Sequence, residues 1–269
     1  MSTKIQQICI PSTVTSIGAN AFNSCRELKE VTIPEGVVSF GDQAFYYCTS
    51  LESISIPSTV TSIGYGILGY CSNLISAEMA VGNPTYVLED DVIYNTERTL
   101  IHTILASKTG EYVIPDSVTT INDYAAVGCE KLTAVTIPTT VTSMGVWAFQ
   151  SCTSLTSVAI PHSIQELPER AFACCYNLKT ISLPHTLTSI GEEALAFCYA
   201  LTKLSVPASV GFIGDAAFAA HNAKFDYSFL TEECKRLGIE INMPVIDTLE
   251  FSRRMYPSLK SHRLGAVCK

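Results

Sequence analysis

The chain has 269 residues, of which 47% are hydrophobic and 16% are charged, and its formal net charge is −8. No run of about 18 apolar residues exists, which excludes a membrane-spanning helix, and the N-terminus lacks the apolar core of a secretory signal, so we expect a cytoplasmic protein. Residues 219–269 hold eight Lys or Arg and six Asp or Glu, whereas the preceding residues hold nine and nineteen. An acidic surface repels phosphates, so any nucleic-acid role must lie in the tail.

The first predicted elements belong to a unit that recurs along most of the chain. A proline after an apolar residue returns at one constant spacing, interrupted by a single long gap between the third and fourth of the series: Pro11, Pro34, Pro57, Pro115, Pro138, Pro161, Pro184 and Pro207. A cysteine follows each of the first seven prolines at a fixed distance, from Cys25 to Cys198, and His221 stands where the eighth is due. A fixed period of this kind predicts a solenoid of stacked coils.

Each unit predicts a short strand, a turn and a short helix. In residues 28–34, Val31 and Ile33 alternate with polar residues, which places the apolar pair in the core and Thr32 outside. Pro34 ends the strand because proline has no amide for a continuing ladder. The apolar residues that follow, over 37–48, are three or four positions apart and predict a short α- or 3₁₀-helix on the opposite side of the coil.

The long gap between Pro57 and Pro115 predicts one coil with a β-hairpin insertion near residues 80–111. Residues 92–94 and 100–101 are strand-like runs, and residues 95–98 between them predict the hairpin turn. Asp90 and Asp91 precede this hairpin where an Asp-Gly turn is usual, so we expect an altered turn there.

The regular cysteines predict small buried core residues rather than disulfides, because an odd ladder of seven cannot pair completely. No Cys-x-x-Cys occurs, so a structural zinc site is not expected, and the adjacent Cys174 and Cys175 are interpreted as one surface and one core position.

The repeat pattern LxxVxIPxxVxxIGxxAFxxC resembles the BspA-like leucine-rich repeat family over about residues 5–218. The resemblance implies a leucine-rich repeat solenoid with a parallel sheet on one side, and a protein-protein interaction scaffold that binds a protein ligand or host surface. Members of the family are often surface-exposed.

The outward strand positions are the candidate binding residues. They form a small, neutral surface without aromatic anchors or arginine clusters: Thr32, Ser55, Thr136, Ala159, Ser182 and Ser205. His162 and His185 occupy equivalent turn positions and are interpreted as solvated side chains, and Trp147 as part of the packing. The first coil has no polar capping unit before it, so we expect either a longer array or a partner, including self-association, at that edge.

The tail beyond residue 218 follows another pattern and predicts an α/β fragment. Residues 220–230, 244–250 and 259–264 resemble the DEDD 3′-5′ exonuclease domain of PolC-type DNA polymerase III. The resemblance implies that Asp226 ligates a metal and that His221 and Asn222 shape the site around it. Such chemistry uses several carboxylates to hold two Mg²⁺ or Mn²⁺ ions.

The first and third acidic motifs of that family are missing, and Asp226 has the alternative role of a helix N-cap. We therefore expect two parts, residues 1–218 as the solenoid and residues 219–269 as a truncated exonuclease-like fragment, joined by fusion or truncation. The first functional hypothesis is a non-catalytic interaction scaffold without a cofactor. The alternative is a 3′-5′ exonuclease that binds nucleic acid through the tail and uses Mg²⁺ or Mn²⁺.

Overall fold

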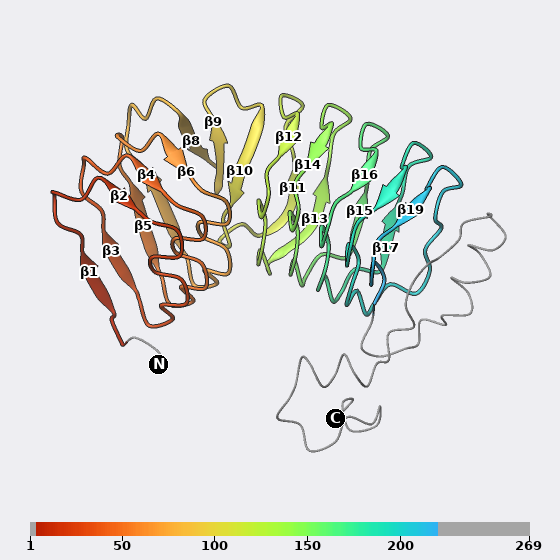
Figure 1. Cartoon of the computed structure of the whole chain (residues 1–269), viewed down its shortest axis with the longest axis horizontal. Helices are drawn as coiled ribbons and strands as arrows, with labels where there is room; N and C mark the ends of the chain where they lie inside the picture. The colour runs from red at the N-terminus through yellow and green to blue at the C-terminus, as the bar shows by residue number, and fades with distance from the viewer. Residues whose placement is uncertain (1–3, 220–269) are drawn as a thin grey trace, which may run out of the picture.

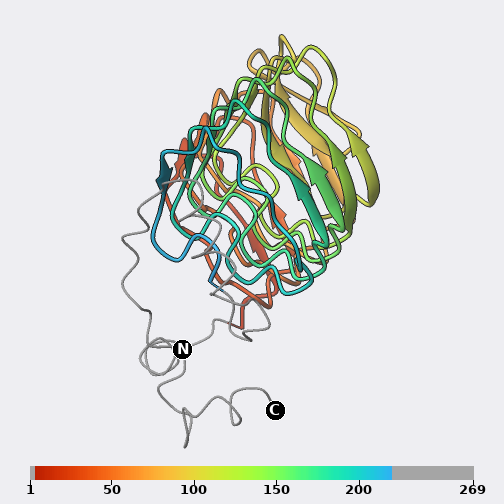
Figure 2. The ribbon, with the colours of Figure 1, turned by 90° about the vertical axis from the view of Figure 1, so that its right-hand side faces the viewer.

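The structure is a computed structural model that describes residues 4–219, and these form a solenoid of stacked coils. The coils follow one another along an arc, with the first coil at one end and the last described coil at the other (Figure 1). Viewed along the stack, successive coils nearly superimpose (Figure 2). The predicted leucine-rich repeat architecture is therefore confirmed. No helix of the described residues could cross a membrane.

One side of the coils carries the main sheet, which consists of two parallel four-stranded pieces in the orders β1-β3-β5-β7 and β11-β13-β15-β17. Its register repeats the sequence period, since Val31 pairs with Ile54 and Val158 with Ile181. Burial alternates along β3, β5 and β15 as the sequence predicts. The strands are β1 Gln7–Cys9, β3 Glu30–Thr32, β5 Ser53–Ile56, β7 Ser76–Met79, β11 Gly110–Val113, β13 Leu132–Thr136, β15 Ser157–Ala159 and β17 Thr180–Ser182.

A second parallel ladder, which the sequence analysis did not anticipate, runs along another side. It is built mostly of two-residue strands: β2 Ser16–Ile17, β4 Ser39–Phe40, β6 Ser62–Ile63, β12 Thr120–Ile121, β14 Ser143–Met144, β16 Glu166–Leu167, β18 Ser189–Ile190 and β19 Phe212–Ile213. The ladder breaks between β14 and β16. Pro168 directly follows β16 and has no amide to donate to the preceding coil, whereas the amide of Gly191 in the next coil donates to Leu167 at 2.7 Å.

The remaining side of the coil consists of turns, and the predicted helix is wrong for the described residues, which contain none. Two positions in each coil adopt positive φ, as Trp147 (61°) and Ser151 (57°) show. A left-handed residue interrupts a right-handed helix and turns the backbone amides along the stack. The amide of Phe149 accordingly donates to the carbonyl of Ala171 in the next coil at 2.8 Å.

The insertion contains the predicted hairpin and one further strand. Strands β8 Tyr86–Glu89, β9 Val92–Asn95 and β10 Leu100–Ile104 are antiparallel, and β10 also pairs in parallel with β12. Asp90 and Asp91, with φ of 47° and 62°, form the β8–β9 turn with both central residues left-handed. Such a turn matches the twist of a hairpin and is usually made with glycine.

Strand β9 separates two hydrophobic cores. The side chains of Val92 and Tyr94 belong to the core of the C-terminal coils, whereas Ile93 belongs to the core of the N-terminal coils. Because side chains alternate along a strand, β9 contributes to both cores at once. The insertion is therefore the joint between two halves of the solenoid.

Candidate functional site

The predicted binding residues lie on the outer face of the main sheet. Thr32, Ser55, Thr136, Ala159 and Ser182 all occupy exposed strand positions. Ser205 is exposed as well, but the last coil forms no strand around it in the described residues. Thr136 pairs with Ala159, and Ala159 with Ser182, so these positions form a row across three coils. The insertion separates this row from Thr32 and Ser55.

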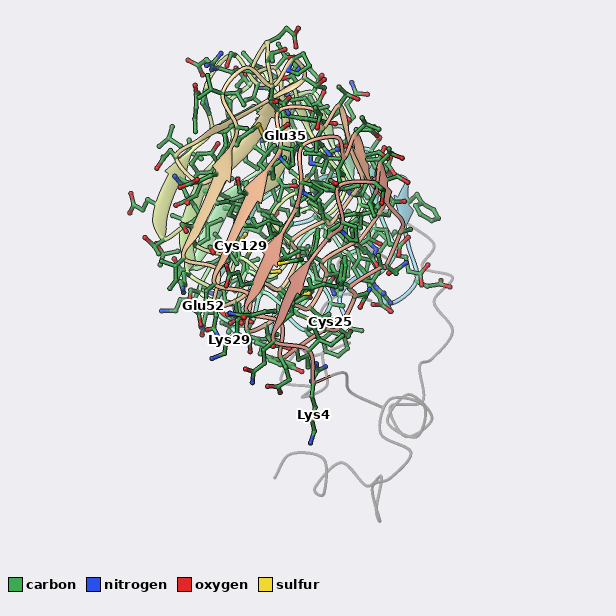
Figure 3. The ribbon with its side chains drawn as sticks, turned by 90° about the vertical axis from the view of Figure 1, so that its left-hand side faces the viewer. Lys4, Cys25, Lys29, Glu35, Glu52 and Cys129 are labelled. Carbon is green, nitrogen blue, oxygen red and sulfur yellow. The ribbon has the colours of Figure 1, made fainter. Side chains whose placement is uncertain are left out.

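The row offers hydroxyl groups on a regular backbone and little charge. Charged residues lie beside the N-terminal part of the face, where Lys29 and Glu52 occupy equivalent positions of successive coils (Figure 3). Within residues 4–219, no group of three or more His, Cys, Asp or Glu could hold a metal ion. The outer face of the main sheet is thus suited to hydrogen bonding and shape recognition rather than to acid-base or metal chemistry.

The candidate exonuclease residues His221, Asn222 and Asp226 lie outside the described residues. His162 and His185 are exposed, and the hydroxyls beside them in their turns donate to backbone carbonyls: Thr186 to the His162 carbonyl at 2.6 Å and Ser163 to the Val141 carbonyl at 2.5 Å. Neither of these contacts holds a histidine ring in a ligating position.

Trp147 is packed as predicted, although on a turn rather than a helix. Its ring lies 5.3 Å from the Tyr124 ring, and the Arg170 guanidinium lies 4.5 Å from the centre of the Trp147 ring. The three residues occupy the same position in successive coils, so this ladder of side chains braces the turn side.

The cysteines are core residues with a hydrogen-bonding role. Cys152 Sγ donates to the carbonyl of Ala126 at 3.4 Å, and Cys175 Sγ donates to that of Phe149 at 3.2 Å, in each case in the preceding coil. Burial raises the pKa of both thiols well above its usual value. Figure 3 shows sulfur atoms in the interior of the coils. A buried neutral thiol is neither a nucleophile nor a metal ligand.

The adjacent cysteines Cys174 and Cys175 differ in burial as predicted. Cys175 is buried and Cys174 is half-buried at a left-handed turn position with φ of 60°. No disulfide joins any two cysteines of the described residues.

The sequence analysis did not identify the polar residues of the insertion that hydrogen-bond to the N-terminal half. His102 is 4% exposed, its Nε2 lies 2.8 Å from the Ile63 carbonyl oxygen, and its Nδ1 lies 2.9 Å from the Thr103 hydroxyl. The amide of Ile63 donates to the Tyr86 hydroxyl at 3.1 Å. In the preceding coil the carbonyl of Phe40 accepts from the amide of Gly64, so His102 replaces the backbone donor that the next coil would supply.

A register shift between Ile101 and Thr103 places His102 at an irregularity of β10. No periodic signal predicts such a position. A lone histidine in an apolar strand was the only signal in the sequence.

A groove also lies at the insertion, with a volume of about 330 Å³. It lies between the end of β7 and β8, and Thr96 and Arg98 complete it. Its lining combines apolar side chains, among them Met79, Val81 and Leu88, with polar groups that include Asn83 and Arg98. The guanidinium of Arg98 is paired with the Glu89 carboxylate, with Nε to Oε2 at 2.9 Å, so its charge is neutralised locally.

These features define a leucine-rich repeat solenoid with an interrupted main sheet and an uncharged outer row at Thr136, Ala159 and Ser182. The chain belongs to the BspA-type leucine-rich repeat family, because it matches the family described as "BspA type Leucine rich repeat region (6 copies)" over residues 1–112 and 104–224.

Two solved structures share the fold. A leucine rich cell surface protein of Faecalibacterium prausnitzii superimposes with a TM-score of 0.73 at 31% identity, covering 80% of this chain and 57% of that protein. The pneumococcal vaccine antigen PcpA gives a TM-score of 0.60 at 20% identity, covering 80% of this chain and 48% of that protein, which supports the fold alone.

The C-terminal segment is a partial exonuclease-like segment. Residues 202–269 match the family described as "Exonuclease". The PolC-type DNA polymerase III of Halalkalibacterium halodurans is 54% identical over 51 residues, and that of Bacillus cereus is 51% identical over 51 residues. These stretches are 19% of this chain and 4% of either polymerase. The repeat and exonuclease matches overlap over residues 202–224, where the sequence satisfies both patterns.

Proposed function

We propose that this chain is a non-catalytic protein-binding scaffold whose ligand, a protein or a host surface, contacts the outer face of the main sheet. The observation that supports it is the row of small exposed side chains at Thr136, Ala159 and Ser182 on a continuous parallel sheet. Backbone hydrogen bonds between coils fix these three positions before a partner binds. Little conformational entropy of the face is therefore lost on binding.

The proposed contact residues are Thr32, Ser55, Thr136, Ser182 and Ser205, all of which are exposed. Such small polar side chains provide shape and hydrogen bonds but few anchors, so each contact contributes weakly. A broad face repeated over several coils compensates by adding many weak contacts.

The binding test uses purified host surface proteins immobilised as an array and probed with the full chain. Thr136→Arg and Ser182→Arg place a bulky charge in the row and should reduce binding at least about tenfold. Thr142→Arg is the matched control because Thr142 is exposed next to the second ladder. Equal loss in the control, or no loss in the row variants, contradicts the proposed face.

The second candidate function rests on the exonuclease-like segment, with a proposed boundary between residues 218 and 219. The resemblance to exonucleases implies the use of a divalent metal, and Asp226 is the carboxylate that would ligate Mg²⁺ or Mn²⁺. A two-metal site needs several carboxylates, and the place of the first acidic motif, before His221, is occupied by the repeat, so we propose that the segment is inactive.

Hydrolysis of a labelled single-stranded oligonucleotide by the full chain, with Mg²⁺ or Mn²⁺ and with EDTA, tests this part. We expect the same background with either metal or with EDTA. Metal-dependent hydrolysis that Asp226→Ala abolishes would establish the exonuclease hypothesis and refute the non-catalytic one.

A further inference from the structure

The main sheet is interrupted at the insertion, and this leaves two strand edges without a partner among the described residues. Strand β7 is the last strand of the first four-stranded piece, and β11 is the first strand of the second. The chain between them leaves the main sheet and joins the second ladder through β10 (Figure 1). An unpaired strand edge presents a row of amide and carbonyl groups to an extended segment.

The three most exposed large hydrophobic side chains of the described residues border this interruption. Val81, just after β7, is 100% exposed; Ile75, just before β7, is 75% exposed; and Val113 in β11 is 67% exposed. The packing of residues 4–219 buries none of them. Their concentration beside an open edge indicates a contact surface rather than scattered exposed residues.

The groove of about 330 Å³ lies at the same place, since Met79 and Val81 of the β7 end and Leu88 of β8 line it. An apolar side chain of a strand added at β7 would have this groove within reach. Arg98, the charged group in the lining, is already paired with Glu89, so the groove offers no free cation to an acidic ligand.

The charges around the interruption are acidic. Glu78 in β7, Glu97 in the β9–β10 turn and Glu111 in β11 are all exposed, and none of these carboxylates forms an ion pair with another described residue. A basic segment would neutralise them, whereas an acidic one would be repelled.

We propose that the interruption is a docking site for an extended, basic segment of a partner protein. The segment adds as a strand to the free edge of β7, places an apolar side chain in the groove and directs Lys or Arg side chains toward Glu78, Glu97 and Glu111. Strand addition supplies backbone hydrogen bonds, and the pocket and charges supply specificity. This site borders the outer-face residues proposed above, since Glu78 pairs with Ser55 and Val113 with Thr136, but it depends on the unpaired β7 edge and the groove. Ser182→Arg, in β17 and away from the interruption, tests the outer-face row alone, so the two proposals can fail separately.

The test measures the fluorescence anisotropy of a labelled peptide of about six residues that alternates lysine and valine, titrated with the full chain. We expect saturable binding that weakens as salt rises. A peptide that alternates glutamate and valine should not bind. A lysine-valine peptide with N-methylated backbone amides should also fail, because it cannot pair with a strand edge.

Two variants locate the site. Val81→Ser removes an exposed apolar contact without disturbing the core and should weaken binding about tenfold. Glu78→Lys should weaken binding of the lysine-valine peptide more than Val81→Ser does at low salt, because it replaces an attraction by a repulsion. Val38→Ser is the control, because Val38 is 45% exposed on a different coil.

Unchanged binding by Val81→Ser, an equal loss in Val38→Ser, or equal binding of the N-methylated peptide overturns the proposal. Sedimentation of the chain without peptide tests a second copy as the occupant. Dimers that Glu78→Lys dissociates would also overturn the proposal, because the edge would then be filled by the chain itself.

Discussion

The ring nitrogen Nε2 of His102 in β10 lies 2.8 Å from the carbonyl oxygen of Ile63 in β6, 39 residues earlier in the chain. This contact joins the insertion to the last coil of the N-terminal half. Because a backbone carbonyl accepts a hydrogen, the contact assigns the proton to Nε2, and Nδ1 accepts from the Thr103 hydroxyl.

Burial lowers the pKa of His102 below its ordinary value of 6.5, and the hydrogen bond to Ile63 opposes this only in part. As the pH falls through about 6.5, the unfolded chain takes up a proton that the folded chain does not, so the free energy of unfolding falls by up to about 1.4 kcal/mol per pH unit. Above that pH the contribution is fully present. Denaturant unfolding at pH 5 to 7.5 should show this slope in the native chain and a smaller one in His102→Gln. His162→Gln, at an exposed site, should keep the native slope; a native slope in His102→Gln would refute the assignment.

The second prediction concerns the glycine that follows the second ladder. A Cβ on Gly64 would lie 2.3 Å from the backbone nitrogen of Asp42 in the preceding coil, whereas a Cβ on Gly18 would have nothing within 4 Å. Gly64→Ala should therefore destabilise the chain by at least about 2 kcal/mol, because backbone atoms must move. Gly18→Ala, at the equivalent position of the first described coil, should change stability by less than about 0.5 kcal/mol. Thermal unfolding followed by circular dichroism compares the two, and equal effects would show that coil spacing is not the cause.

The third prediction concerns thiol reactivity. Cys152 and Cys175 are fully buried with raised pKa values, whereas Cys9 is exposed. A short iodoacetamide pulse at pH 8 should modify Cys9 and leave both buried thiols unmodified, because only an accessible thiolate reacts. Peptide mass spectrometry gives the extent at each position, with the denatured chain as the control in which all three react. Rapid modification of Cys152 in the native chain would contradict the buried ladder.

The fourth prediction concerns two buried tyrosines that tie the insertion to the C-terminal half. The hydroxyls of Tyr94 in β9 and Tyr112 in β11 lie 2.6 Å apart, and both side chains are 5% exposed. Tyr112→Phe or Tyr94→Phe alone leaves one hydroxyl without its partner and should destabilise the chain by about 1 to 2 kcal/mol. The double variant should cost less than the sum of the two, which a double-mutant cycle by urea unfolding measures. Additive effects would show that the two hydroxyls do not interact.

The sequence by itself determined the repeat, the strand alternation and the hairpin. The constant period is visible in the positions of proline, cysteine and apolar residues. Proline ends a strand through its local chemistry, whereas the cysteines and apolar residues recur because those positions are buried. Val31 and Thr32 therefore pointed inward and outward as predicted. The burial of Cys152 and the packing of Trp147 were also predictable, because a residue that recurs in phase with the core shares its environment.

Only the tertiary structure decided what the turn side and the insertion do. The spacing of apolar residues after each proline is compatible with a helix. The backbone amides of this segment instead donate to carbonyls of the next coil, as the amide of Phe149 does to Ala171. Whether a helix or a turn forms therefore depends on a neighbour one full coil away. The contact of His102 with Ile63 and the interruption between β7 and β11 likewise depend on how coils stack, not on any local pattern. Local sequence chemistry therefore determined the repeating coil, whereas contacts between stacked coils determined the turns, the insertion and the open strand edges.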